Sequence, residues 1–425
     1  MNDLRIGDES PYEDLFRIEN AAKASGGTIE DPHPIWAELL AKGAVHKGTL
    51  AECMGLPPER SGGGLYMPGT TYYSVFSFAA VSEVFTRKDD FGSEVYLDMG
   101  TVTQFGDSIL NMDGLRHRRY RDLIQPYFQP AMAQSWWRDK VIAKLVNDLV
   151  GSFEKQECVD LSAQYFSRLP LHTVTSGFGM SFQEGVAFRG EMLRTLHATT
   201  PEARAAARVG AGRVLDSVIR ARQQEPRDDL ISKLAHAILE GEDSTPRKLS
   251  VEEIASFCRL IVFAGGETTW RQLGICMFAL LDHPEQLAEV IADRALLPNA
   301  ILESTRWNPD PLFPRKVKRD TVLHGVKLPA GAHLHLCLAA ANRDPSRWQH
   351  PEKFAIHRPV QRSVAFAAGA HSCLGQHVAR QEIESALNGL FDRFPNIRWD
   401  PSKPRARLTG SLAQRGPTAL PVLLH

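Results

Sequence analysis

The longest regular pattern in the chain runs over residues 250–283, where apolar residues recur around much of the circumference of a helix. Ser250 and Glu253 have the spacing of a capping box, which predicts that the helix begins there. A helix that is apolar on most of its surface must be buried. Pro284 predicts the start of a further helix, since proline is favoured at the first helical position. The pattern therefore places one long helix in the interior.

Shorter patterns before and after this helix predict strands. Residues 71–76 are typical of a strand and precede a helical run over 79–86, whereas residues 333–338 alternate at period two. Residues 415–422 predict a last short β segment, and residues 48–66, with two prolines and three consecutive glycines, predict a surface loop. The remainder is mostly helical. We therefore predict a mainly α fold with small β sheets, of the α+β class.

Composition favours one large domain. The 425 residues exceed the usual single-domain length, but no linker, repeat or low-complexity tract divides them, and 43% hydrophobic residues can build a large core. We expect a single domain over 1–425, with β-rich parts at 1–110 and 312–425 and a mostly helical part at 114–308. The net charge of −1 offers no general attraction for nucleic acid or anionic lipid, so no nucleic-acid partner is expected.

The distribution of apolar residues and cysteines predicts a cytoplasmic protein. Residues 1–10 carry charge where a signal peptide or membrane anchor needs an apolar run. The longest apolar stretches, such as 260–266 and 334–341, are too short to span a bilayer. The six cysteines are dispersed without disulfide or zinc spacing, which fits a reducing compartment.

One cysteine stands in a distinctive context. Cys373 lies in a glycine-containing loop, residues 366–375, which opens onto an amphipathic helix. A thiolate at a helix N-terminus faces backbone N–H donors and the positive end of the helix dipole, which lower its pKa. A lone intracellular thiol is more often a buried structural residue. The surrounding pattern instead favours a metal ligand.

The long helix contains a second unusual segment, residues 264–269, with two glycines, an acid and two threonines where a core helix prefers leucine. A mid-helix glycine costs about 1 kcal/mol relative to alanine, and buried polar groups need partners. One interpretation is a local kink in which Thr268 bonds back to a carbonyl one turn earlier. The other is a widened groove that admits dioxygen and water.

Together these segments resemble the cytochrome P-450 superfamily. The spacing F-x-x-G-x-H-x-C-x-G resembles its haem-ligand loop, and A-G-x-E-T-T resembles its distal-helix motif. The resemblance implies a fold in which haem b (iron protoporphyrin IX) lies between the long distal helix and the cysteine-loop helix, with the Cys373 thiolate as iron ligand. Many members have glycine after the phenylalanine, where this chain has Ala367. The residues implied to contact the cofactor include Ala264, Gly265, Phe366, Gly369 and Gly375.

The resemblance also implies roles for acidic and basic residues. Glu267 and Thr268 would supply protons for splitting dioxygen, while the cysteine thiolate supplies electron density. His117, Arg121, Arg315 and His371 match positions that contact haem propionates in the family, although each cation taken singly is more often just solvated. The remaining cations, Arg116, Arg118, Arg119 and Arg380, would receive an acidic redox partner.

Glu303 and Arg306 stand three residues apart on one helix face, where a surface ion pair worth under about 1 kcal/mol is the default. The family's E-x-x-R pair is completed by an arginine into a buried network behind the haem loop. By resemblance Arg358 takes that place. We assign these three residues a scaffold role.

The function that the resemblance implies is a soluble haem-thiolate monooxygenase inserting one atom of dioxygen into a hydrophobic small molecule. Electrons would come from a separate ferredoxin-type donor with an NAD(P)H-dependent reductase, and we expect a monomer without a membrane anchor. For Leu260 and Phe263 ordinary core packing is an equal alternative to substrate contact. The pocket candidates are Leu260, Phe263, Leu312, Phe313 and Leu412.

Three alternatives remain open at the level of sequence. The chain could be a peroxygenase that uses hydrogen peroxide directly, although the retained acid and alcohol favour dioxygen. It could be a non-catalytic haem-thiolate sensor or carrier. In a third, haem-free interpretation Cys373 is structural. The identity of the substrate cannot be read from the residues.

Overall fold

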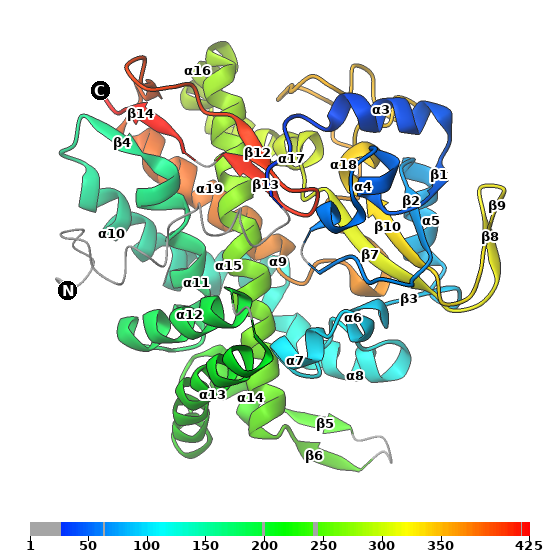
Figure 1. Cartoon of the computed structure of the whole chain (residues 1–425). Coiled ribbons are helices and arrows are strands. Elements are labelled where there is room, and N and C mark those ends of the chain that lie inside the picture. Colours follow the sequence, from blue (N-terminus) through cyan, green and yellow to red (C-terminus); the bar gives the residue numbers. More distant parts are fainter. Residues whose placement is uncertain (1–26, 63, 198–199, 241–244, 418) are drawn as a thin grey trace.

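The computed structural model describes residues 27–62, 64–197, 200–240, 245–417 and 419–425 (Figure 1). The charged N-terminal stretch 1–10 lies outside the described residues. So do Gly63 of the predicted loop 48–66 and Thr418 of the predicted C-terminal β segment.

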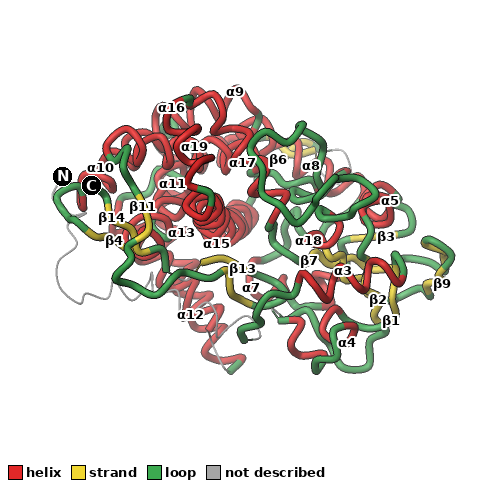
Figure 2. Tube along the Cα trace, turned by 90° about the horizontal axis from the view of Figure 1, so that it is seen from above, coloured by secondary structure: helices red, strands yellow, loops and turns green. Residues whose placement is uncertain are grey.

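The predicted long helix is α15, Val251–Asp282, and it runs through the middle of the molecule (Figures 1 and 2). Its N-terminus is the predicted capping box: the Ser250 hydroxyl accepts from the Glu253 amide, and the Glu253 carboxylate accepts from the Ser250 amide. The helix continues without a break through Gly265 and Gly266. It packs against helices on one side and against strand β13 on another, so its apolar circumference is buried as the pattern predicted.

Helices form most of the molecule around α15. Those before it are α3 (His33–Lys42), α4 (Leu50–Cys53), α5 (Phe78–Thr86), α6 (Val95–Asp98), α7 (Thr101–Phe105), α8 (Gly114–Ile124), α9 (Pro130–Met132), α10 (Ala143–Phe153), α11 (Leu169–Gly177), α12 (Phe182–His197), α13 (Pro201–Gln224) and α14 (Leu230–His236). Those after it are α16 (Pro284–Ala292), α17 (Leu297–Trp307), α18 (Leu338–Ala341) and α19 (Gln376–Arg393). Helix α16 begins at Pro284, as predicted.

Short 3₁₀ and π segments join these helices. The 3₁₀ turns are Pro58–Ser61, Gln125–Phe128, Arg294–Leu296 and Gly369–His371, and the π-helical segments are Ala133–Ile142 and Ser162–Phe166. The π segment at Ala133–Ile142 packs against α19 and α11. Trp137 from this segment is fully buried, and a side chain at Gly177 of α11 would come within 2.5 Å of its ring.

A five-stranded sheet lies on the opposite side of α15 from α10, α11 and α12 (Figure 1). Its order is β1 (Val45–Lys47), β2 (Tyr72–Val75), β10 (His333–Cys337), β7 (Leu312–Val317) and β3 (Phe91–Gly92). Strand β10 is parallel to β2 and antiparallel to β7. The sheet therefore joins the first hundred residues to the region after α17.

The other sheets are small. Strand β14 (Pro421–Leu423) pairs with β11 (Arg398–Trp399) and β4 (Cys158–Asp160). Three two-stranded ribbons are β5 (Ile238–Glu240) with β6 (Pro246–Lys248), β8 (Thr321–Leu323) with β9 (Val326–Leu328), and β12 (Leu408–Gly410) with β13 (Arg415–Pro417). The prediction of a mainly α fold with small β sheets is confirmed.

Two local predictions were wrong in part. Residues 48–66 contain a helix and a 3₁₀ turn instead of a continuous surface loop, and Leu50, Ala51 and Leu65 are buried. All five residues of β10 are buried, although period-two alternation predicted one exposed face. Leu334 and Leu336 pack in one core cluster and Cys337 packs in another with Trp36 and Leu50, so both faces of the strand are covered.

Within the described ranges, no helix has both the length and the apolar character needed to cross a membrane.

Candidate functional site

A cavity of about 1020 Å³ lies between α15 and the loop that precedes α19. The α15 residues Ala264, Gly265, Glu267 and Thr268 line it from one side. Phe366, His371, Cys373 and Gly375 line it from the loop. Two motifs that are far apart in the sequence therefore open into the same space.

The cysteine loop is held by backbone constraints. The Cys373 amide donates to the Phe366 carbonyl at 2.9 Å, which closes the loop. Gly369 has φ +75°, and a side chain there would collide with the Phe85 carbonyl oxygen at 2.4 Å. Ala367, the residue at which the loop departs from the motif that it resembles, has φ +56°, in the left-handed region that costs a non-glycine residue about 1 kcal/mol. The departure from the family pattern is thus a strained residue in an otherwise complete loop.

The Cys373 thiol is exposed to the interior cavity. Burial raises the pKa of the Cys373 thiol, while hydrogen bonds from the backbone amides of Gly375 and Gln376 and the charges of Arg121 and Arg380 lower it. The helix N-terminus lowers the pKa of Cys373 as predicted, but burial raises that pKa by more. The predicted contribution of the helix N-terminus is confirmed, and the larger effect of burial was not visible in the sequence.

On α15, the Thr268 hydroxyl donates to the Ala264 carbonyl at 2.7 Å. This is the hydrogen bond that the interpretation of a local kink predicted. No kink accompanies that bond, since α15 is continuous. A side chain at Gly265 would lie 3.2 Å from Val174 Cγ2, so glycine lets α11 approach closely here. Ala264 is exposed in the middle of a core helix because it faces the cavity.

Glu267 is buried and paired. Its Oε1 lies 2.6 Å from Arg189 Nη2, and its Oε2 lies 3.9 Å from Arg271 Nη2. Trp270 Nε1 donates to Oε2 at 3.4 Å. Burial disfavours the carboxylate, but the charges of Arg189 and Arg271 outweigh burial and hold the pKa of Glu267 below its ordinary value. Glu267 is therefore an ionised carboxylate in this arrangement.

The predicted propionate residues gather in one region. The rings of His117 and His371 stack with centroids 4.0 Å apart, and His371 Nε2 lies 2.9 Å from Asp113 Oδ1. Arg121 Nη2 donates to the Ser372 carbonyl at 2.8 Å, which ties α8 to the cysteine loop. His117 Nε2 is buried without a hydrogen-bond partner among the described residues. Burial, His371 and Arg121 lower the pKa of His117 to about 4.

Arg315 belongs to the same group of basic side chains. It lines the cavity, and its guanidinium lies 4.7 Å from the centre of the Phe313 ring. Burial lowers the pKa of Arg315, and Tyr96 opposes that effect. Arg121, Arg315 and His371 thus bring basic groups to the cavity wall, with Asp113 as their acidic neighbour.

The three scaffold candidates form a buried network. Arg306 binds Glu303 through two hydrogen bonds of 2.7 and 2.8 Å, and Arg358 Nε lies 2.9 Å from the same carboxylate. The remaining donors of both arginines reach backbone carbonyls between residues 342 and 353. The arrangement is buried, unlike the surface ion pair that was the default expectation.

Four of the five predicted pocket residues, Leu260, Phe263, Leu312 and Phe313, line the cavity. Leu412 lies elsewhere: it is fully buried in a cluster that includes Trp36 and Leu50. The next two residues, 413 and 414, line the cavity instead. His117 and Gly369 support the loop from outside the lining.

Sequence reasoning missed several charged residues of the cavity wall, among them Arg189, Arg271, Asp310 and Glu382. Arg271 stands four residues after Glu267, so helical spacing could have paired them. No pattern in the sequence predicted that Arg189 of α12 lies beside Glu267.

The remaining predicted cations are engaged within the chain. Arg116 pairs with Asp107, Arg118 lies 3.7 Å from Asp122, and Arg119 lies 3.4 Å from Glu240. Arg380 stacks on the Phe366 ring at 5.0 Å. Arg118 remains largely exposed, and the proposed role of these cations toward a redox partner stays a prediction.

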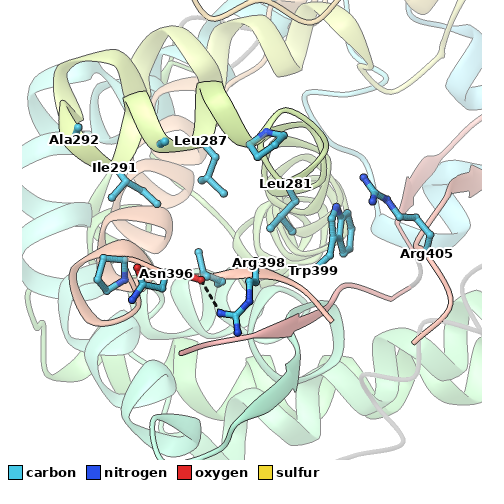
Figure 3. Close-up of a pocket in the computed structure, with 12 residues that line it drawn as sticks. Leu281, Leu287, Ile291, Ala292, Asn396, Arg398, Trp399 and Arg405 are labelled. Carbon is cyan, nitrogen blue, oxygen red and sulfur yellow. Dashed lines mark hydrogen bonds between the residues drawn. The ribbon is translucent and has the colours of Figure 1, made fainter. Parts of the chain in front are cut away.

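A second hollow of about 510 Å³ lies between α16 and β11 (Figure 3). Leu281, Leu287, Ile291, Trp399 and Arg405 line it, and Arg398 Nη1 donates to the Asn396 carbonyl at 3.2 Å beside it. None of the predicted site residues lines this hollow.

The fold and the cavity fit a haem-binding protein, and comparison with known proteins identifies the family. The cytochrome P450 family model matches residues 180–414, more than half of the chain. The chain therefore belongs to the cytochrome P450 family, and at the level of the family it is a monooxygenase that uses haem iron, dioxygen, a substrate and a source of electrons.

Individual relatives are bacterial P450 enzymes. The chain is 32% identical to cytochrome P450 107B1 of Saccharopolyspora erythraea, over 76% of this chain and 78% of that protein. It is 31% identical to the mycinamicin IV hydroxylase/epoxidase of Micromonospora griseorubida, over 74% and 79%. Among solved structures, CYP109E1 of Bacillus megaterium with corticosterone is similar with a TM-score of 0.77 and 26% identity, covering 93% of this chain and 98% of that one.

The residues of the cavity fit a haem group. A flat dianionic cofactor needs an open space, a thiolate ligand on one face and cations at one edge. The cavity offers the exposed Cys373 thiol, the exposed Ala264 surface on α15, and the basic residues Arg121, Arg315 and His371. The unpartnered His117 Nε2 nearby is a further donor for a carboxylate.

Proposed function

We propose that this P450 enzyme binds haem b through Cys373 and inserts one atom of dioxygen into an apolar small molecule. The observation that carries the proposal is the exposed Cys373 thiol, which opens with Ala264 and Thr268 into one interior cavity. Haem bound there supplies the activation of dioxygen.

In this proposal the chain positions the cofactor with few residues. Cys373 provides the iron ligand, and the amides of Gly375 and Gln376 with Arg121 stabilise its negative charge. Arg121, Arg315, His117 and His371 bind the two propionates by charge-assisted hydrogen bonds. The buried network of Glu303, Arg306 and Arg358 holds the backbone behind the loop.

Thr268 and Glu267 take different parts in proton supply. The Thr268 hydroxyl already donates to the Ala264 carbonyl, so it has lone pairs free to accept a hydrogen bond from water. Glu267 is held ionised by Arg189, so it serves as a proton acceptor that passes protons on, and not as a permanently protonated acid. We infer that water joins the two side chains.

The substrate is expected to be mainly apolar, because Leu260, Phe263, Leu312 and Phe313 line the cavity. Similar enzymes are named for hydroxylation and epoxidation, or have been crystallised with a steroid. We propose the same reaction types here. Electrons come from a separate ferredoxin-type protein with an NAD(P)H-dependent reductase, and the enzyme acts as a cytoplasmic monomer.

The first test is spectroscopic. Reduced wild-type protein under carbon monoxide should show the red-shifted absorbance band of a haem thiolate, and Cys373→Ser should lose it. Cys53→Ser is the matched control, since Cys53 does not line the cavity. Colourless wild-type protein, or an unchanged band in Cys373→Ser, would overturn the proposal.

The second test separates dioxygen from peroxide as oxidant. With a surrogate ferredoxin system and a lipophilic substrate, Thr268→Ala should divert reducing equivalents to hydrogen peroxide, whereas Thr269→Ala should not. Product formed with hydrogen peroxide alone at the same rate would favour the peroxygenase. Absence of product under both conditions, despite an intact spectrum, would favour a sensor or carrier.

A further inference from the structure

Arg271 is a charged side chain of the cavity wall that the reaction described above does not use. It is only 6% exposed and lines the cavity. Its Nε and Nη2 atoms are buried without a hydrogen-bond partner in the part of the chain that the structure describes. The Glu267 oxygen that faces it is 3.9 Å from Nη2, beyond hydrogen-bonding distance. Buried donors of this kind are costly unless something binds them.

The two unpaired atoms define a particular ligand geometry. Nε–H and one Nη–H of a guanidinium point in parallel along one edge, and this edge matches the two oxygens of a carboxylate. A hydroxyl or a single carbonyl would satisfy only one of the two donors. The free edge of Arg271 therefore fits a carboxylate better than a neutral oxygen group.

The position of Arg271 is fixed by its neighbours. Its guanidinium lies 4.4 Å from the centre of the Trp270 ring. A side chain at Gly416 of β13 would come 3.3 Å from Arg271 Cβ, so the ribbon packs closely against the stem of the arginine. Because the side chain is held in place, little conformational freedom is lost when a ligand binds it.

Asp310 stands beside this arginine in the segment between α17 and β7, and it also lines the cavity. Among the described residues no hydrogen bond to its carboxyl group is found. Burial raises the pKa of Asp310 to about 6, although Arg271 opposes that effect. Such a carboxyl group accepts a proton readily and can then donate a hydrogen bond to an anion.

We propose that Arg271 and Asp310 form an anchor for the carboxylate of an otherwise apolar substrate; this inference rests on the proposed function. Glu267 forms an ion pair with Arg189, so Arg271 is left to balance the negative charge of a substrate carboxylate. A substrate carboxylate bound beside Asp310 would raise the pKa of Asp310 further, so that Asp310 takes up a proton and donates a hydrogen bond to the substrate. A substrate amine is disfavoured, since Arg271 would repel it. The apolar part of the substrate contacts Leu260, Phe263 and Phe313.

The test compares matched probes on the haem-loaded enzyme. Dodecanoic acid, its methyl ester and dodecyltrimethylammonium, a cation that cannot ligate iron through nitrogen, are titrated. Dissociation constants are measured both from the haem absorbance and by calorimetry. The acid should bind wild-type protein at least about tenfold more tightly than the ester, as a charge-assisted pair of hydrogen bonds implies. Equal binding of acid and ester, or tighter binding of the quaternary ammonium probe, would overturn the anchor.

Variants assign the preference to Arg271. Arg271→Met should abolish it, and Arg271→Lys, which keeps the charge but loses the parallel donors, should lose most of it. Arg194→Met is the matched control, because Arg194 lines the same cavity but pairs with Glu191; the preference should remain. An acid preference that survives Arg271→Lys and Arg271→Met undiminished would exclude Arg271 as the anchor, and loss of haem in these variants would place Arg271 in the cofactor site instead.

Failure of this inference is distinguishable from failure of the proposed function. Absence of the carbon monoxide band in wild-type protein would contradict the proposed function. If haem-loaded protein shows the band but binds the acid no more tightly than the ester, only the proposed anchor is contradicted.

Discussion

At the scale of single residues, the site depends on a small number of buried charges that compensate one another. Glu267 is the central case, since a carboxylate within a core helix is stable only beside a cation. Arg189 supplies that cation from α12, with Nη2 at 2.6 Å from Oε1. The acid that the sequence singled out thus has a partner that the sequence did not reveal.

Removal of this partner should therefore cost stability. Arg189→Met leaves Glu267 with Arg271, 3.9 Å away, as its cation and with a long hydrogen bond from Trp270. We expect the free energy of unfolding at pH 7 to fall by about 3 kcal/mol. Chemical denaturation measures the change. Arg194→Met, which removes an exposed pair with Glu191, should cost under about 1 kcal/mol; equal losses in both variants would contradict the argument.

The pH dependence of this loss has a defined sign. The pKa of Glu267 lies below its ordinary value of 4.5, so its stabilising charge is fully present above that value and is lost as the pH falls through the lowered pKa. In Arg189→Met the poorly paired carboxyl group takes up a proton at higher pH. The stability difference between wild type and variant should therefore shrink on acidification, and a difference that grows would be inconsistent with the pair.

At the scale of elements, α15 shows why a long helix can be predicted from sequence. Its capping box consists of nearby residues, and its apolar composition alone indicates that it is buried. The predicted bounds 250–283 therefore match the observed Val251–Asp282 within a residue at each end. The burial of strand β10 and of residues 48–66 was harder to predict from the sequence, because it depends on segments remote in the sequence.

The cap of α15 should have a measurable effect. The Ser250 hydroxyl accepts a hydrogen bond from the Glu253 amide at 3.2 Å, and Ser250→Ala removes that acceptor. We expect a loss of about 1 kcal/mol in the free energy of unfolding. Ser250→Asp, which keeps an acceptor at the helix N-terminus, is the control and should retain most of the stability. No change in Ser250→Ala would mean that tertiary contacts alone fix the helix start.

At the scale of the whole molecule, the cysteine loop is linked to the core by the network around Glu303. Arg306 Nη1 donates to the Asn342 carbonyl at 3.0 Å, and Asn342 Oδ1 accepts from the Val364 amide at 2.9 Å. The Val364 carbonyl in turn accepts from the Ala367 amide at 2.9 Å. This sequence of hydrogen bonds ends in the loop that carries Cys373, so the network supports the loop from behind.

Disruption of this network should affect both stability and the cofactor. Arg306→Met leaves one oxygen of Glu303 and the carbonyls of Asn342 and Pro351 without their arginine donor, and we expect a loss of at least about 3 kcal/mol. Haem retention after gel filtration should fall in parallel, as measured by the ratio of haem absorbance to protein absorbance. Arg220→Met, at an exposed pair with Asp216, is the control and should change neither.

The sequence was sufficient for the family, the helical class and the motifs of the site, because those features are carried by short local patterns. It was not sufficient for Arg189, Asp310 and Leu412, whose places depend on how distant segments pack. The strain at Ala367 could be located only once its φ of +56° was known. The single-domain organisation over 1–425 stays a prediction.

The mixed sheet has a consequence for how the chain is made. Strand β10 fills the place beside β2, and it is synthesised some 260 residues later, since β2 ends at Val75 and β10 begins at His333. Until the ribosome has released that part of the chain, β2 presents an open edge that can pair with other chains. Closing so long a loop is also slow. We therefore expect newly made chains to be prone to aggregation until β10 is available, and slow expression to raise the yield of folded protein.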